Sequence, residues 1–217
     1  MIQLDVIKNY YPDSLSKNII FHKYILKEYI LLLILDYLST TSFIRKIAFI
    51  GGTSIRLIKN IDRFSEDLDF DCKYFSKDEF TGMTGGIIKF LLNNGLKVAE
   101  KKSDDKKLKA FRSNLHFPEL MFQMGLSGHK EERFLIKIEC QDQLADYKPE
   151  MINIKGCGFF FPIPALYLFW RRLASSRVLY ISGLPDYITL ILLTAIASTG
   201  MLVHYFARDD ASRRQKR

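Results

Sequence analysis

Two short groups of residues in this chain of 217 have the types and spacing that phosphate and metal chemistry require. The first group is Gly51, Gly52, Thr53 and Ser54. Its glycines leave backbone N–H groups free of side chains, and its hydroxyls add donors, so it suits a phosphate. The second group is Asp67, Asp69 and Asp71. These aspartates alternate, so on a strand they share one face, where their mutual repulsion favours a divalent cation such as Mg²⁺.

A further acid on another strand would complete such a metal site. Glu139, in the segment Ile136-Lys137-Ile138-Glu139-Cys140, is the candidate. Two metal ions about 3.5–4 Å apart would activate an attacking oxygen and stabilise a leaving pyrophosphate, while the protein supplies positioning and charge neutralisation. We therefore predict catalytic and metal-binding roles for Asp67, Asp69 and Glu139.

The nucleotide-binding prediction covers the first group and one nearby arginine. Its residues are Gly51, Gly52, Thr53, Ser54 and Arg56. For Arg56 a second interpretation stays open, in which it packs against Asp67 instead of contacting phosphate. Arg63 and Ser65 are expected to position the aspartate strand.

The elements that would hold these residues alternate between strand and helix. Residues 44–50 are an apolar run that predicts a strand ending at the glycines, and residues 53–59 predict a short helix capped by Thr53 or Ser54. Residues 67–72 predict the next strand. A strand, two glycines, a helix and then alternating aspartates form a much more specific pattern than any one of these features alone.

The rest of the chain predicts a mixed sheet with flanking helices, an α/β fold. Helices are expected over 14–38 and over 76–94, and the second opens with a capping box. Further strands are expected near 96–101, 107–116 and 133–140, turns at 103–105 and 127–129, and a break in the pattern at 159–164. We place a core domain at 1–160 and a helical C-terminal region at 161–217.

The composition is typical of a folded protein, and the net charge suits binding to a polyanion. The chain is 48% hydrophobic and 26% charged, and its net charge of +8 suits a nucleic-acid partner. Three widely spaced cysteines form no CxxC pair, which argues against a zinc ribbon and a disulfide framework and favours a reducing compartment. The first residues lack the pattern of a signal peptide, so the cytoplasm is the expected location.

Residues 19–71 resemble the AbiEii/AbiGii-type toxin nucleotidyltransferases of bacterial abortive-infection, phage-defence and toxin–antitoxin systems. Residues 48–57 and 62–70 match the first motif of that family, and the resemblance continues more loosely to Pro164, with Glu139 in the position of a later acidic strand. The resemblance implies a polymerase-β-like nucleotidyltransferase core, dependence on Mg²⁺, and transfer of a nucleotide from an NTP. It also implies an RNA acceptor, with tRNA as the first candidate, and a cognate antitoxin protein.

The C-terminal region departs from that family. Its members carry a Lys and then a Lys-Gly-Arg-Asp-x-Tyr-Asp stretch, whereas the nearest segment here has Arg177 and Tyr180 but Val178 and Ile181 in place of the aspartates. Two interpretations stay open. The tail after Leu166 is diverged or frame-shifted, which we favour, or other residues hold the triphosphate. The candidates for the second interpretation are Arg171, Arg172 and Arg177.

Residues 187–207 form a nearly uncharged apolar run followed by basic residues. Polar residues dilute the run, so a buried helix is expected rather than a membrane span, although a membrane-anchored protein stays among the alternatives. The other alternative to an enzyme is a catalytically impaired relative that only binds RNA or an antitoxin.

Overall fold

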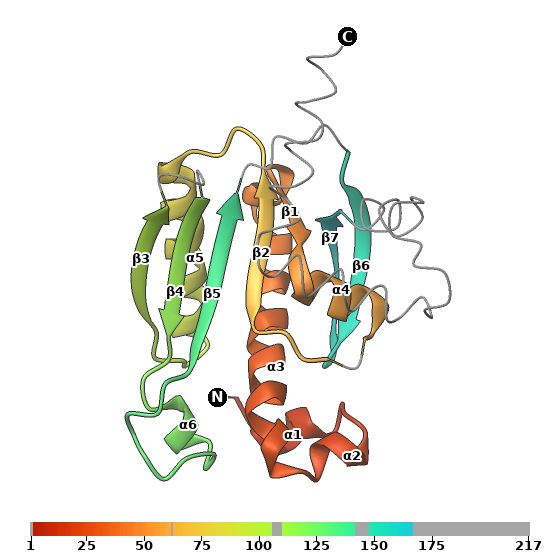
Figure 1. Ribbon diagram of the computed structural model, residues 1–217, viewed down its shortest axis with the longest axis vertical. Coiled ribbons are helices and arrows are strands. Elements are labelled where there is room, and N and C mark those ends of the chain that lie inside the picture. Colours follow the sequence, from red (N-terminus) through yellow and green to blue (C-terminus); the bar gives the residue numbers. More distant parts are fainter. Residues whose placement is uncertain (1, 62, 106–109, 142–147, 167–217) are drawn as a thin grey trace, which may run out of the picture. The chain divides into compact units, whose positions relative to one another are not determined.

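The computed structural model describes residues 2–61, 63–105, 110–141 and 148–166 (Figure 1). Its helices are α1 (Leu4–Lys8), α2 (Asp13–Ser16), α3 (Ile19–Ser39), α4 (Gly51–Lys59), α5 (Lys77–Asn93) and α6 (Leu120–Gln123), with a 3₁₀ turn η1 (Ser42–Arg45). Its strands are β1 (Ile47–Ile50), β2 (Asp67–Cys72), β3 (Ala99–Asp105), β4 (Ala110–His116), β5 (Leu135–Gln141), β6 (Glu150–Gly156) and β7 (Phe159–Ala165). The described residues up to Ala165 form one compact unit.

The strands form one seven-stranded sheet in the order β3-β4-β5-β2-β1-β7-β6. Two neighbouring pairs, β2 with β5 and β1 with β7, are parallel, and the other four are antiparallel. The predicted fold class, a mixed sheet with flanking helices, is therefore confirmed for the described part of the chain.

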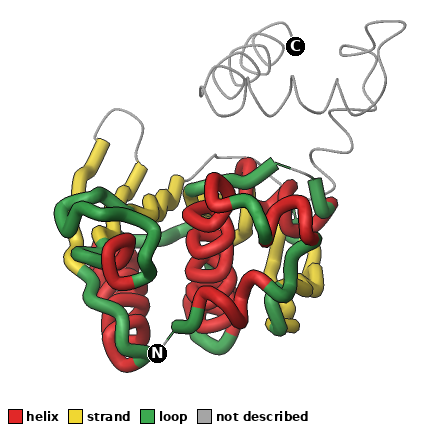
Figure 2. Tube along the Cα trace, turned by 90° about the horizontal axis from the view of Figure 1, so that it is seen from below, coloured by secondary structure: helices red, strands yellow, loops and turns green. Residues whose placement is uncertain are grey.

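The two faces of the sheet differ in chemistry. On β2 and β5 the residues that face α3 and α5 are apolar, whereas the alternating residues on the other face include the charged Asp67, Asp69, Lys137 and Glu139. Figures 1 and 2 show α3 and α5 side by side on the same side of the strands. We call the opposite, polar side of β2, β5 and β4 the open face.

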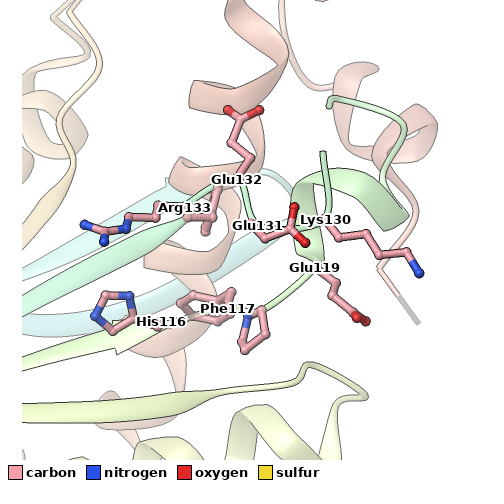
Figure 3. Close-up of a pocket in the computed structure, with 9 residues that line it drawn as sticks. His116, Phe117, Glu119, Lys130, Glu131, Glu132 and Arg133 are labelled. Carbon is pink, nitrogen blue, oxygen red and sulfur yellow. The ribbon is translucent and has the colours of Figure 1, made fainter. Parts of the chain in front are cut away.

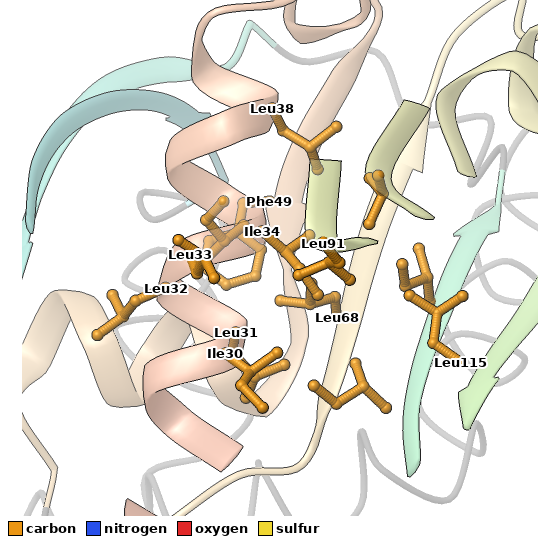
Figure 4. Close-up of a cluster of buried hydrophobic side chains, with 14 of the residues drawn as sticks. Ile30, Leu31, Leu32, Leu33, Ile34, Leu38, Phe49, Leu68, Leu91 and Leu115 are labelled. Atoms are coloured by element: carbon orange, nitrogen blue, oxygen red, sulfur yellow. The ribbon is translucent and has the colours of Figure 1, made fainter. Parts of the chain in front are cut away.

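The long helix α3 supplies the centre of the core (Figure 4). Six consecutive residues, Ile30–Leu35, are at most 8% exposed, so this part of the helix is enclosed on all sides. Phe49 of β1 and Leu68 of β2 pack into the same cluster. Removing such side chains from a close-packed core costs about 2–5 kcal/mol each, so α3 anchors the strands on which the site lies.

Helix α5 begins as its sequence predicts. The Ser76 side chain accepts a hydrogen bond from the Glu79 N–H, and the Glu79 carboxylate accepts one from the Ser76 N–H. This capping box satisfies two backbone donors that a helix start otherwise leaves unpaired. The predicted helix near 76–94 is confirmed by α5, and the one near 14–38 by α2 and α3.

Several predicted boundaries were wrong. Strand β1 begins at Ile47, because residues 42–45 form the 3₁₀ turn, and α4 begins at Gly51, so that Ile50 is its N-cap instead of Thr53 or Ser54. The turn predicted at 103–105 is instead the end of β3. Residues 159–164, expected to break the pattern, lie in β7, which pairs along its whole length with the unpredicted strand β6.

Candidate active site on the open face of the sheet

The register of β2 against β5 brings the three predicted carboxylates to neighbouring positions. Asp69 pairs directly with Glu139, and Asp67 lies two residues away on the same face of β2. Because side chains on one face of adjacent paired strands are close neighbours, the acids from two distant segments form one group. We call Asp67, Asp69 and Glu139 the acidic group.

Two cations from the same face pair with this group. Lys137 Nζ lies 3.1 Å from Asp67 Oδ2. Arg112 Nε donates to Glu139 Oε2 at 2.7 Å, and its Nη2 lies 3.5 Å from Oε1. Within the part of the chain that is described, no three His, Cys, Asp or Glu side chains are arranged as a ready metal-binding set. The carboxylates are brought together by register, but two of the three are held by cations.

The third aspartate of β2 does not share this setting. Asp71 is only 2% exposed and pairs in register with Gln141 and Ala48. The three aspartates look equivalent in the sequence because they alternate. In the structure one of them is buried and the other two reach the open face.

The surroundings of Asp69 disfavour its ionised form. Burial, together with the nearby charges of Asp67 and Glu139, raises the pKa of Asp69 to about 6, against the opposing effect of Lys137 and Arg112. Desolvation and like charges both disfavour a carboxylate. A divalent cation at this position would relieve that cost, so the donor chemistry fits a hard cation that prefers oxygen ligands.

The glycine pair has a steric function in this arrangement. A Cβ on Gly51 would lie 2.3 Å from Asp69 Oδ2, and Gly51 has a φ of +76° that disfavours other residues. A Cβ on Gly52 would lie 3.1 Å from Ser65 Oγ. The glycines therefore let the start of α4 approach the Asp69 carboxylate closely.

The hydroxyls of Thr53 and Ser54 are buried and already bonded. Thr53 Oγ1 donates to the backbone oxygen of Asp67 and lies 2.8 Å from Ser65 Oγ. Ser54 Oγ donates to the Gly51 carbonyl at 2.9 Å. These contacts fasten α4 to β2, and Ser65 takes part as expected. The predicted phosphate contacts of the two hydroxyls stay a prediction. The first N–H groups of a helix such as α4 have no partner within the helix and attract anions.

Arg56 forms a buried ion pair with Glu28 of α3, instead of packing against Asp67. Arg56 Nε donates to Glu28 Oε2 at 2.9 Å, with side chains 10% and 7% exposed, and the guanidinium lies over the Phe64 ring. Tyr11 donates to the same carboxylate at 3.0 Å, and burial followed by the Glu28 charge raises the pKa of that tyrosine. This network ties α4 to the N-terminal helices. A phosphate contact by Arg56 stays a prediction.

Lys137, Arg112 and Glu28 are site residues that the sequence alone did not indicate. Lys137 had one visible signal, since it alternates with Glu139 in a strand pattern. Arg112 and Glu28 had none, because their partners lie 27 and 28 positions away in the chain and only the tertiary register brings them together.

A separate hollow of about 350 Å³ lies at the other end of β4 and β5 (Figure 3). Its wall includes His116, Glu119, Lys130 and Arg133, with charges of both signs. None of the predicted site residues lines this hollow. It therefore adds nothing to the acidic group.

Comparison with known proteins supplies the classification. Residues 33–166 match the family described as nucleotidyl transferase AbiEii toxin, type IV TA system. The chain belongs to this family. The match contains the glycine pair, both aspartates and Glu139, so the predicted family is confirmed on the segment that carries the site.

Two solved structures from Helicobacter pylori are similar to the chain. JHP933 is 18% identical with a TM-score of 0.47, covering 70% of this chain and 56% of its own. A protein described as a proposed nucleotidyltransferase is 20% identical with a TM-score of 0.46, covering 69% of this chain and 57% of its own. The chain thus spans little more than half the length of either structure. No curated protein sequence matches it.

Several predictions lie outside the described residues. They are Asp62 of the first motif, the arginines Arg171, Arg172 and Arg177, the helical region after Leu166, and the apolar run 187–207. Among the described helices, none is both long enough and apolar enough to cross a membrane.

Proposed function

We propose that this chain is a Mg²⁺-dependent toxin nucleotidyltransferase that transfers a nucleotide from an NTP to an RNA acceptor, with tRNA as the first candidate. The observation that carries the proposal is the direct pairing of Asp69 with Glu139, beside Asp67 and against the glycine start of α4. Family membership supports the reaction class and a type IV antitoxin as partner. The cytoplasm, where NTPs and tRNA are present, is the proposed location.

In this proposal the residues of the open face act by position and charge. Asp67 and Asp69, together with Glu139, would hold Mg²⁺, which when bound supplies charge neutralisation at the phosphates and activation of the acceptor hydroxyl. The backbone N–H groups at Gly51 and Gly52 face the triphosphate. A bond forms between the acceptor 3′-oxygen and the α-phosphorus, and the bond to the pyrophosphate oxygen breaks.

The close approach of Gly51 to Asp69 gives this arrangement its geometry. The helix start that would bind phosphate lies directly beside the Asp69 carboxylate that would bind metal. A metal ion and the triphosphate of one nucleotide could therefore bind next to each other. Positioning of this kind is the main contribution that a protein makes to phosphoryl transfer.

Incubation of the purified protein with Mg²⁺, each labelled NTP in turn and total tRNA tests the proposal. We expect label on RNA with the wild-type protein and none after addition of EDTA or with Asp69→Ala. Asp13→Asn, which changes an exposed aspartate of α2, is the matched control and should transfer label normally. Wild-type transfer by Asp69→Ala would contradict the mechanism, and nucleotide binding without transfer by the wild type would instead support a binding module.

A further inference from the structure

Lys137 and Arg112 occupy different settings, although both pair with the acidic group. Arg112 holds the more buried acid, Glu139, through two of its nitrogens, and the exposed fractions of the two side chains are 30% and 17%. Lys137 holds Asp67 through one ammonium group, with both side chains more than a third exposed. A planar guanidinium on two carboxylate oxygens fixes orientation, whereas a single exposed ammonium exchanges partners easily.

From this difference we infer that Lys137 is a triphosphate-binding residue. When a divalent cation binds the Asp67 carboxylate, the Lys137 ammonium exchanges this partner for the phosphates of the nucleotide. Arg112 stays on Glu139 and acts as a positioning residue. The inference rests on the proposed function and names a residue that the nucleotide-binding prediction did not include.

The charge balance of the open face supports this exchange. Three carboxylates and two cations leave the metal-free group with a net charge of about −1, which repels a polyphosphate. One divalent cation on Asp67 and Asp69 turns the same group to about +1 and at the same time leaves the Lys137 ammonium without its partner. Metal binding therefore creates both the attraction for the triphosphate and the free cation to receive it.

Position supports the same conclusion. Lys137 pairs in register with Asp67 and lies two residues from Glu139 on the same face of β5, so its ammonium is one side-chain length from the metal-binding carboxylates. A flexible lysine beside a metal ion is well suited to phosphate oxygens.

The test compares Lys137→Met, which keeps the aliphatic stem, with Lys101→Met. Lys101 is exposed on β3 in the same row of the sheet, because it pairs with Asn114, which pairs with Lys137. Two affinities are measured for each protein: Mn²⁺ alone, by the electron paramagnetic resonance signal of free Mn²⁺, and inorganic triphosphate on the Mn²⁺-loaded protein, by calorimetry. Inorganic triphosphate removes any contribution from the base.

We expect Lys137→Met to bind Mn²⁺ at least as tightly as the wild type, because a competing cation is gone. It should bind triphosphate about tenfold more weakly, the effect of one lost charge-assisted contact. Lys101→Met should match the wild type in both. Unchanged triphosphate affinity in Lys137→Met, or weakened Mn²⁺ affinity, would overturn the inference and leave the proposed function standing. A wild-type protein that binds neither probe would overturn the proposed function itself.

Discussion

Replacing Asp69 by Asn should stabilise the metal-free protein while abolishing metal binding. The pKa of Asp69 is about 6 in the folded chain against an ordinary 3.8, because burial and the charges of Asp67 and Glu139 disfavour its ionised form. That difference corresponds to at most about 3 kcal/mol of folding free energy. Since the folded pKa is raised, the wild type loses this stability as pH rises from about 4 to about 6, and the neutral asparagine does not.

Urea unfolding in EDTA at several pH values measures this effect. Asp69→Asn should equal the wild type near pH 3.5, exceed it by up to about 3 kcal/mol at pH 8, and gain nothing when Mg²⁺ replaces EDTA, whereas Mg²⁺ should stabilise the wild type. Asp13→Asn, which changes an exposed aspartate of α2 outside the acidic group, is the control and should follow the wild type. A variant that is less stable than the wild type at pH 8 in EDTA would refute the electrostatic reasoning.

Two further predictions concern the packing of α5 and the buried ion pair between α3 and α4. Gly85→Ala should raise the free energy of unfolding by up to about 1 kcal/mol, because among the described residues nothing beyond the adjoining helix backbone lies within 4 Å of the new methyl group, and alanine favours the helix. Gly86→Ala should lower it by about 1–3 kcal/mol, because the methyl group would lie 2.5 Å from the hydroxyl of Tyr37. Thermal melts that rank the two variants in the opposite order would contradict the described packing. Glu28→Gln should cost about 3–5 kcal/mol by leaving the Arg56 guanidinium buried without its carboxylate, and the double Glu28→Met, Arg56→Met variant should cost clearly less in urea unfolding.

Features that depend on neighbouring residues in the chain could be predicted from the sequence. The capping box at Ser76, the alternation of Asp67 and Asp69 and the glycine pair before a helix all depend on spacings of a few residues. Glu139 could be proposed from its place in a short strand pattern, and the resemblance to a family then placed it in a later acidic strand; its register opposite Asp69 could not be predicted. The family itself is confirmed over residues 33–166.

Features that depend on register could not be predicted. Lys137 and Arg112 meet the acidic group only because β5 lies between β2 and β4 in one alignment. A shift of β5 by one residue would turn Lys137 and Glu139 to the opposite face and take Glu139 away from Arg112. Strand β7 was missed for another reason, since Pro162 and Pro164 argue against a strand inside a sheet. It tolerates them because β1 pairs with it only at Ala165 and leaves the rest of that side without a ladder.

The glycine pair and the aspartates are one structural requirement rather than two motifs that occur together. Any side chain on Gly51 would collide with the Asp69 carboxylate, so a glycine at this position is what lets the start of α4 lie beside the carboxylate that we propose as a metal ligand. Thr53 is also hydrogen-bonded to the backbone oxygen of Asp67, so this contact and the close packing at Gly51 together fix the distance between the start of α4 and the aspartates of β2. The hydroxyls of Thr53 and Ser54, predicted from the sequence to contact phosphate, hold α4 in place through their hydrogen bonds in this structure. Phosphate binding by these hydroxyls, or by the backbone N–H groups at the start of α4, stays a prediction.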